Sequence, residues 1–178
     1  MKRGRVEVSV GFPPIEDAAA RVLVLGSLPG VKSLEMREYY AQPYNAFWRI
    51  MGELVGAGPE LEYPARLVRL RAHGIAVWDV LAAGEREGSL DSAIVPASIV
   101  VNDFGAFFAR HRELRSICFN GNTAAGLFKR KVLPGLEPQW AAIERRTLPS
   151  TSPAYASLRF EQKLARWREA LDGFATPL

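Results

Sequence analysis

The segment RVLVLGSLPG, residues 21–30, joins a short apolar run to a loop that holds two glycines and a proline. RVLVL has the length and the branched side chains of a buried strand. The chain continues as VKSLEMREYYAQPYNAFW to residue 48, with one amide, Asn45, just before Phe47 and Trp48. The tip GSLPG contains no histidine, cysteine or carboxylate. This loop therefore offers backbone groups, aromatic rings and an amide.

Strand and helix patterns alternate along the rest of the chain. Three further strand patterns are IAVWDV at 75–80, SICFNG at 116–121 and IERRTL at 143–148. Helical patterns occupy residues 45–58, 64–74, 102–111, 122–131 and 160–174. The stretch between residues 80 and 102 is predicted as a loop rich in glycine and serine. Strands spaced by helices predict an α/β fold, a three-layer sandwich with a central parallel four-stranded sheet flanked by helices.

Length and composition narrow the class of protein. The chain of 178 residues predicts a single domain over residues 1–178, expected to be a monomer. It is 48% hydrophobic and 24% charged, and no apolar run approaches the roughly 18 residues of a membrane helix. Glu7 interrupts the basic start MKRGRVEVSV, which predicts a cytoplasmic protein without a signal peptide. The net charge of +4 favours a polyanionic partner.

The loops after the four predicted strands carry the unusual residues. These loops are GSLPG, WDV, FNGN and LPSTSPA. In open α/β sheets, ligands bind beyond the carboxyl ends of the strands. We therefore expect the four loops to converge on one cleft.

Several side chains in these loops have a structural alternative. Asn45 and Asn122 can each cap the helix that follows, and Asp79 can cap a turn instead of contacting a ligand. Tyr39 and Tyr40 are either stacking surfaces for a planar base or members of the core and its rim. The sequence leaves these alternatives open.

Other chemistries are disfavoured by absent motifs. The chain has neither the GK[ST] of a phosphate-binding loop nor GxGxxG, which argues against nucleoside triphosphate and NAD sites. His73 and His111 are far apart and Cys118 is the single cysteine, so we expect no metal and no cofactor. We predict that Cys118 is a small buried residue within a strand. No GxSxG esterase motif is present.

Two ordered motifs resemble a known family. The pairing of GSLPG…YYAQPYNAFW with LPSTSPA at 148–154 resembles the uracil-DNA glycosylase superfamily, most of all its hypoxanthine-DNA (deoxyinosine) glycosylase branch. The likeness runs from about residue 20 to 170, and GIAVWDVL, GSLDSAI and ICFNGNTA resemble internal segments of that branch.

The resemblance implies roles for individual residues. Leu28 stands where many relatives use Asp or Asn to position water, and Leu148 where relatives often begin the second motif with histidine. The implied catalytic residue is Asn45, and Tyr40 matches the aromatic residue that stacks on the base. The implied base-binding residues are Gly26, Ser27, Leu28, Pro29, Gly30, Tyr40, Phe47, Trp78 and Asp79. The DNA-binding residues that the resemblance implies are Pro149, Ser150, Thr151, Ser152 and Pro153. The start of a helix favours an anion, so we also expect a DNA phosphate to bind at Asn120, Gly121 and Asn122.

The expected function is that of a monofunctional DNA glycosylase of base excision repair. It would hydrolyse the N-glycosidic bond of a flipped deaminated base, hypoxanthine before uracil, and leave an abasic site. The expected partner is double-stranded DNA, with single-stranded DNA as an alternative. Rival interpretations are a uracil-specific glycosylase, a non-catalytic DNA-binding module on the same fold, and a small-molecule hydrolase or nucleotide-binding protein.

Overall fold

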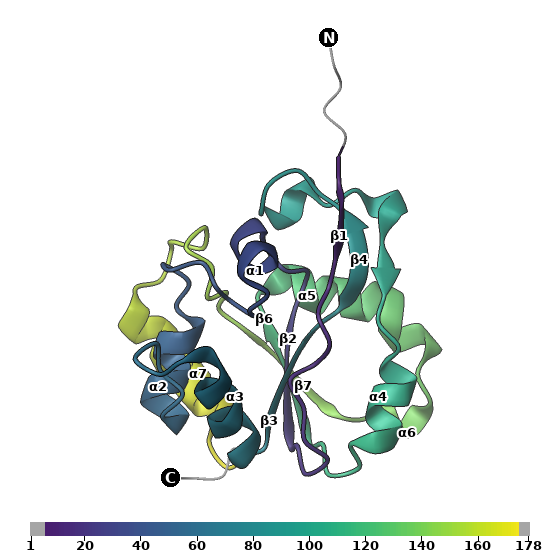
Figure 1. Ribbon diagram of the computed structural model, residues 1–178. Helices are drawn as coiled ribbons and strands as arrows, with labels where there is room; N and C mark the ends of the chain where they lie inside the picture. The colour runs from purple at the N-terminus through teal and green to yellow at the C-terminus, as the bar shows by residue number, and fades with distance from the viewer. Residues whose placement is uncertain (1–5, 175–178) are drawn as a thin grey trace.

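A computed structural model of the protein describes residues 6–174, so residues 1–5 of the basic start lie outside the described residues. Its central sheet has four parallel strands in the order β3-β2-β6-β7 (Figure 1). These strands are β2 (Val22–Gly26), β3 (Ile75–Asp79), β6 (Ser116–Asn120) and β7 (Glu144–Leu148). All four predicted strands are confirmed.

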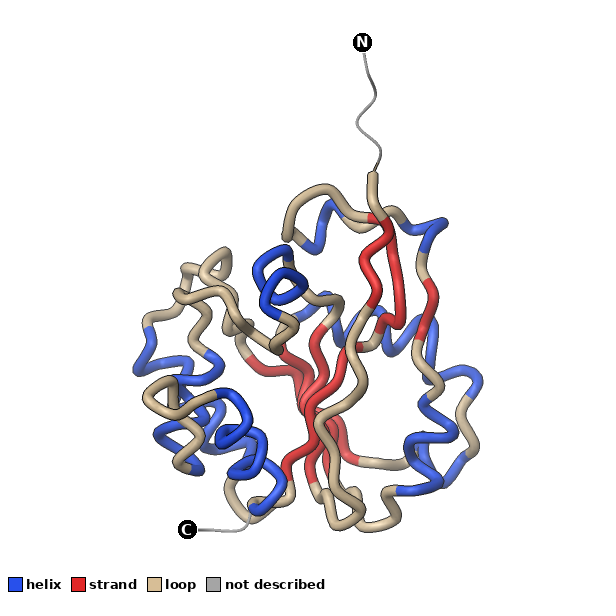
Figure 2. The backbone as a smooth tube through the Cα atoms, in the orientation of Figure 1, coloured by secondary structure: helices blue, strands red, loops and turns tan. Residues whose placement is uncertain are grey.

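Helices cover both faces of this sheet (Figures 1 and 2). One face carries α2 (Phe47–Val55), α3 (Tyr63–Ala72) and α7 (Phe160–Leu171). The other carries α4 (Phe104–Arg110), α5 (Asn122–Leu127) and α6 (Pro138–Ala141). The predicted three-layer sandwich is confirmed. Within residues 6–174, no helix is both long and apolar enough to cross a membrane.

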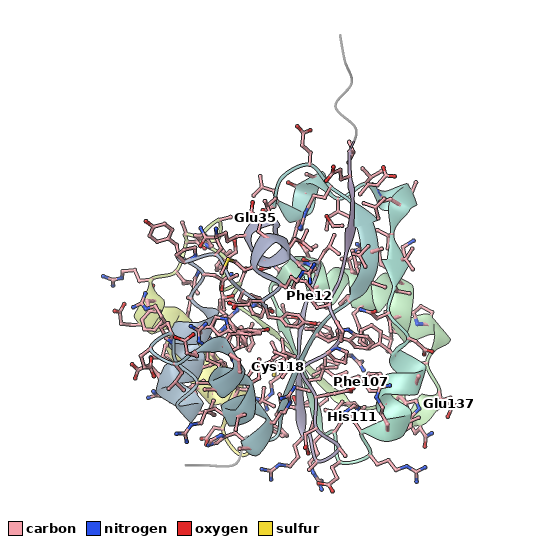
Figure 3. All side chains as sticks on the ribbon, viewed as in Figure 1. Phe12, Glu35, Phe107, His111, Cys118 and Glu137 are labelled. Atoms are coloured by element: carbon pink, nitrogen blue, oxygen red, sulfur yellow. The ribbon has the colours of Figure 1, made fainter. Side chains whose placement is uncertain are left out.

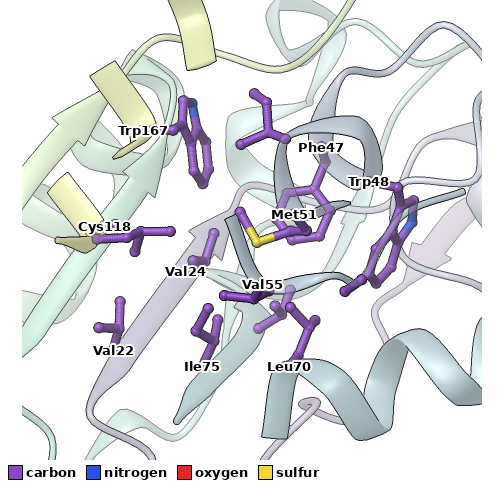
Figure 4. Packing of buried hydrophobic residues seen from close by; sticks show 14 of the residues in the cluster. Val22, Val24, Phe47, Trp48, Met51, Val55, Leu70, Ile75, Cys118 and Trp167 are labelled. Carbon is purple, nitrogen blue, oxygen red and sulfur yellow. The ribbon is translucent and has the colours of Figure 1, made fainter. Parts of the chain in front are cut away.

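Alternate residues of β2 supply the two halves of the core. Val22 and Val24 pack with helices α2, α3 and α7 (Figure 4), whereas Leu23 and Leu25 pack with α4 and α5 on the opposite face. Successive side chains of a strand point to opposite faces, so a strand covered on both sides reads as a continuous apolar run. This arrangement explains why RVLVL has no polar alternation.

The side chains of the single cysteine and of the two histidines are buried within the fold. Cys118 lies near the centre of the molecule (Figure 3), and burial raises the pKa of its thiol to about 11. Nδ1 of His73 lies 2.7 Å from the Arg69 carbonyl oxygen, and Nδ1 of His111 lies 2.7 Å from that of Phe107. Among residues 6–174, no group of three potential metal ligands comes together.

A second sheet was not predicted. Strands β1 (Val8–Val10), β4 (Leu81–Glu85) and β5 (Val100–Val101) pair antiparallel in the order β1-β4-β5. The prediction of a continuous loop between residues 80 and 102 is therefore wrong. The sequence of β4, LAAGE, has no β-branched residue, so its strand conformation depends on its two neighbours rather than on its own propensity.

Short helical segments also went unpredicted. Helix α1 (Val31–Met36), which follows the GSLPG loop, is one of them. The π-helical turn at Phe128–Val132 instead continues α5 through the end of the helix predicted over residues 122–131. Single 3₁₀ turns lie at Asp91–Ala93, Pro96–Ser98 and Leu133–Gly135.

The strand order creates a crevice at one edge of the main sheet. From β2 the chain passes to β3 on one side, and later enters β6 on the other side. The connection after β2 passes over one face of the sheet through α2 and α3, and the connection after β6 passes over the other face through α5. The loops beyond the carboxyl ends of β2 and β6 therefore diverge. Ligands of open α/β sheets bind at this kind of switch point.

Candidate active site

A cavity of about 570 Å³ lies at this edge of the sheet. Its lining joins the loop after β2, the end of β3, the end of β6 and the loop after β7. The predicted residues that line it are Gly26, Ser27, Leu28, Pro29, Gly30, Tyr40, Asn45, Asp79, Asn120, Ser150, Thr151, Ser152 and Pro153. The expected convergence of the four strand-end loops thus brings both sequence motifs to one pocket.

Two polar groups in this pocket are buried and unpaired. Oδ2 of Asp79 and the hydroxyl of Tyr40 have no hydrogen-bond partner in the described part of the chain. A Cβ atom built on Gly26 would lie 2.5 Å from Oδ1 of Asp79 and 3.0 Å from the Tyr40 hydroxyl. Only the absence of a side chain at Gly26 leaves these groups room. Because an unpaired buried polar group costs free energy, the pair points to a ligand that supplies the missing partners.

The backbone of Tyr40 supports the same conclusion. Its φ of 54° is in the left-handed region, which residues other than glycine rarely adopt. Its ring stacks on that of Phe47, with centroids 4.1 Å apart and planes inclined by 28°. Phe47 itself is fully buried, so it supports Tyr40 rather than lining the pocket. Strained backbone of this kind is concentrated at functional positions.

The pKa of Asp79 is raised to about 7, mainly by burial, with the charge of Asp91 adding to the shift and Arg86 opposing it. In the unfolded chain this carboxyl titrates near 3.8. Between about pH 4 and pH 7 this carboxyl is therefore more protonated in the folded protein than in the unfolded chain, and the stability that it contributes falls as the pH rises.

We expect Asp79→Asn to remove this pH dependence. The free energy of unfolding of the variant, relative to the parent protein, should increase between about pH 4 and pH 7 by on the order of a few kcal/mol and level off above pH 7. Urea unfolding of both proteins across this range measures the difference. If the difference in unfolding free energy between the two proteins did not change with pH, the pKa of Asp79 would not be raised in the folded protein.

Asn45 both bonds to the first turn of α2 and lines the pocket. Its Oδ1 accepts the backbone N–H of Phe47 at 3.0 Å, so it stabilises the start of α2 from the position before the N-cap residue Ala46. The side chain is also half-buried and lines the pocket. Among residues 6–174, its Nδ2 group has no hydrogen-bond partner. The amide thus keeps a donor that is not bonded to any of the described residues.

The second motif is tied to the first by backbone and side-chain bonds. Asn120 at the end of β6 donates from Nδ2 to Oγ1 of Thr151 at 2.8 Å and accepts the Thr151 N–H at 2.9 Å. The Thr151 carbonyl in turn accepts the N–H of Ala46 at 2.9 Å. Asn120 and Thr151 therefore position the loop against the Asn45 segment, and their polar groups are already engaged with each other.

Helix α7 fixes the same loop from behind. Nε1 of Trp167 donates to the Pro149 carbonyl at 3.0 Å, and Nζ of Lys163 donates to the Ser152 carbonyl at 3.3 Å. Lys163 is buried, and desolvation lowers the pKa of its ammonium group. The Ser/Thr/Pro loop is thus a rigid surface beside the pocket.

A second cavity of about 600 Å³ adjoins the first. Its lining includes Gly121, Asn122, Thr147, Leu148, Pro149, Arg146 and Arg166 together with the acidic Asp91 and Glu169. Nε of Arg146 bonds Glu144 at 2.6 Å, whereas Arg166 forms no ion pair within residues 6–174. This groove offers an exposed cation close to the pocket.

Asn122 does not cap α5, so the structure rules out one of its two alternatives. The N-cap residue is Gly121, and no side chain bonds to the first turn of the helix. Gly121 has a φ of +97°, and a Cβ atom there would lie 3.1 Å from Cβ of Ser150. Glycine is required because the chain turns tightly against the second motif, which leaves Asn122 exposed on the wall of the groove.

Trp78 does not lie in the pocket. It contacts Phe104 and Phe107 on the opposite face of the sheet, and its Nε1 donates to the Phe12 carbonyl at 3.1 Å. Because neighbouring strand residues point to opposite faces, Asp79 faces the pocket and Trp78 cannot. The location of Trp78 corrects its predicted contact with a base.

Comparison with known proteins identifies the family. The model of the family described as "Uracil DNA glycosylase superfamily" matches residues 13–173. The chain belongs to the uracil DNA glycosylase superfamily. The resemblance seen in the two sequence motifs is therefore confirmed.

Two curated relatives in this superfamily are named hypoxanthine DNA glycosylase. The one from Methanosarcina acetivorans is 39% identical over 145 residues, which cover 81% of this chain and 86% of the relative. The one from Methanosarcina barkeri is 39% identical over 112 residues, which cover 62% of this chain and 70% of the relative.

The fold is shared with a solved structure of the same superfamily. This is the solution NMR structure of a protein from Methanosarcina acetivorans that is provisionally described as a uracil DNA glycosylase. Its TM-score is 0.73 at 34% identity, with 92% of this chain and 99% of that chain covered.

The two leucines that depart from the superfamily pattern are core residues here. Leu28 is 6% exposed and packs in the same core cluster as Leu25, and Leu148 is 7% exposed and packs with Trp167. Neither position supplies a polar group to the pocket. Asn45 and Asp79, in contrast, contribute polar side chains to the lining of the pocket.

The segment at residues 86–92 was missed as part of the site. Ser89, Leu90, Asp91 and Ser92 line the pocket, and Arg86 lies directly behind the GSLPG loop. The single sequence signal was the resemblance of GSLDSAI to an internal segment of the hypoxanthine branch. Residue types alone could not reveal these contacts, because the pairing of β4 with β1 and β5 brings the segment over the first motif.

Proposed function

We propose that this protein is a monofunctional DNA glycosylase that removes hypoxanthine from DNA, with uracil as a second substrate, and leaves an abasic site. It would act as a single-domain monomer on duplex DNA. The names of the two curated relatives and membership of the superfamily support this proposal. The observation that carries it within the structure is the unpaired Asp79 carboxyl beside the unpaired Tyr40 hydroxyl in the pocket.

This pair suits a deaminated base. Hypoxanthine and uracil both present a ring N–H next to a carbonyl, whereas adenine and cytosine present a ring acceptor next to an amino group. An ionised Asp79 accepts the ring N–H, and Tyr40 donates to the carbonyl. Burial raises the pKa of the Tyr40 phenol, which keeps it a donor. Adenine and cytosine lack this donor–acceptor pair, so the pocket would favour each deaminated base over the base from which it arises.

The base must first leave the DNA stack. Flipping the nucleotide costs a few kcal/mol, and less for a mispaired base such as hypoxanthine. In the pocket, Tyr40 would lie at the edge of the base, where its hydroxyl reaches the carbonyl, and would not stack on the face of the base. The rigid Ser/Thr/Pro loop at 149–153 would support the extruded strand.

Bond cleavage would use the remaining free amide. Loss of the base builds positive charge on the sugar, and Nδ2 and Oδ1 of Asn45 can orient a water molecule towards it. Preorganised polar groups of this kind stabilise the transition state because they need no rearrangement during the reaction. We propose no lyase step, so strand breaks should appear only after alkali treatment.

The test uses purified protein and chelator with matched duplexes that hold one deoxyinosine or one deoxyuridine. Alkali-labile breaks at inosine support the proposal, and breaks at uridine alone would favour a uracil-specific glycosylase. Breaks without alkali would refute the monofunctional assignment. Binding without breaks on either substrate would favour the non-catalytic module, and the absence of salt-dependent DNA binding would favour a small-molecule substrate.

Arg166→Glu tests the groove as a DNA contact. Since Arg166 is exposed and unpaired in the described residues, the charge reversal should weaken duplex binding about tenfold at low salt and reduce the salt dependence by about one phosphate contact. Titration of a fluorescent duplex at several salt concentrations measures both effects. The control is Arg112→Glu, an exposed residue near the amino end of β6 at the opposite edge of the sheet. Equal losses in both variants would contradict a contact at the groove.

A further inference from the structure

A buried arginine holds the first motif from behind. Arg86 follows β4, and its side chain is 1% exposed. It donates from Nη1 to the Leu28 carbonyl at 3.5 Å and from Nη2 to the Pro29 carbonyl. These are successive carbonyls of the GSLPG loop. A rigid planar guanidinium is well suited to fix two neighbouring acceptors.

The residues after Arg86 hold the rest of the loop. Asp91 lies 3.7 Å from Nη1 of Arg86 and accepts the hydroxyl of Ser27 at 2.6 Å. Oγ of Ser89 accepts the N–H of Val31 at 2.9 Å. Residues 86–91 therefore form hydrogen bonds along the whole loop, from Ser27 to Val31.

This arrangement determines the direction of one backbone donor. No peptide in residues 6–174 is cis, so the Gly30 N–H points away from the Pro29 carbonyl that Arg86 holds. Gly30 lines the pocket, and no hydrogen bond of its N–H is found in the described residues. The donor is thus fixed and unpaired.

Stability alone does not explain Arg86. Its guanidinium is desolvated, which lowers its pKa, and its Nε has no partner within residues 6–174. Replacing a buried ion pair by apolar residues is often neutral for stability, so the buried charge itself is weak evidence of a stabilising role. The two hydrogen bonds that its guanidinium donates instead fix the backbone of the GSLPG loop.

We propose that Arg86 is a positioning residue: by holding the Leu28 and Pro29 carbonyls it presents the Gly30 N–H to an oxygen acceptor of the flipped nucleotide. This inference rests on the proposed function. Arg86 acts through the backbone of the first motif and does not itself touch the substrate.

The kinetic test compares Arg86→Met and Arg86→Lys with the parent protein on inosine-containing duplex. Arg86→Met should lower kcat at least tenfold and change KM less than about threefold, because the DNA groove is untouched. Arg86→Lys, which keeps the charge, should recover part of kcat. A folded Arg86→Met variant with the parental kcat overturns the proposal, whereas an inactive parent protein refutes the proposed function instead.

A second measurement does not need activity. In Arg86→Met, the ¹⁵N order parameters of residues 27, 28, 30 and 31 should fall from about 0.85 to below about 0.6, while residues 150–152 stay rigid. Lys163→Met is the matched control, because it removes the cation behind the second motif and should loosen residues 150–152 alone. Unchanged order at residues 27–31 in Arg86→Met overturns the proposal whatever the enzyme assay shows.

Discussion

Gly26→Ala should lower excision of hypoxanthine at least 100-fold. The new Cβ atom would lie 2.5 Å from Oδ1 of Asp79, a separation so short that the 4% exposed carboxylate would have to shift. It would also lie 3.0 Å from the Tyr40 hydroxyl. Both groups proposed to recognise the base would have to move, and displacements of about 1 Å in a catalytic pocket cost about 100-fold in rate. Single-turnover excision on inosine-containing duplex measures the loss.

The structure supplies a control for this variant. Gly135 has open space where a Cβ atom would be added, so Gly135→Ala should keep full activity. Gly26→Ala should still bind undamaged duplex with about the parental affinity, because the groove proposed to contact the phosphates does not include Gly26. Thermal unfolding shows whether the fold is kept. A folded Gly26→Ala protein with normal turnover would mean that the base does not enter this pocket.

Asn45→Asp should lower the excision rate about 100- to 1,000-fold, the effect typical of removing one preorganised donor. Aspartate keeps the oxygen that accepts the Phe47 N–H and caps a helix about as well as asparagine, but it lacks the free Nδ2 donor. The melting temperature should therefore stay near the parental value. Rates at saturating enzyme, with duplex binding measured separately, isolate the chemical step.

Asn45→Ala separates the two roles of the side chain. It removes both the donor and the capping oxygen, so it should lose activity and also about 1 kcal/mol of stability. If Asn45→Asp is fully active and Asn45→Ala is merely less stable, Asn45 is a structural residue of α2 and another group must orient the water.

The main sheet could be predicted because its strands are locally distinctive. RVLVL, IAVWDV, SICFNG and IERRTL each stand between helical patterns, and all four became parallel strands. The antiparallel sheet could not be predicted in the same way. β4 is weak by composition and β5 has two residues, so their conformation depends on pairing with each other and with the distant β1.

The site was predictable in its loops but not in its contacts. The motifs at residues 26–30, 45 and 149–153 meet in one pocket, as the placement of strand ends implies. The positions of three side chains could be found only from the structure. Trp78 lies on the face of the sheet away from the pocket, the ring of Phe47 lies behind that of Tyr40, and Asn120 is hydrogen-bonded to Thr151. Each depends on which atoms are neighbours in space, which residue type does not reveal.

By itself, the sequence determined the alternation of strands and helices, the superfamily and the loops that carry its motifs. These are local properties, since strand length, helix periodicity and motif residues lie within short stretches of chain. Only the tertiary structure decided that Asp79 and Tyr40 are buried without partners, that Gly26 makes room for them, and that Arg86 stands behind the first motif. These facts arise from close packing between segments distant in the chain, where one missing Cβ atom or one buried donor changes what the pocket can bind.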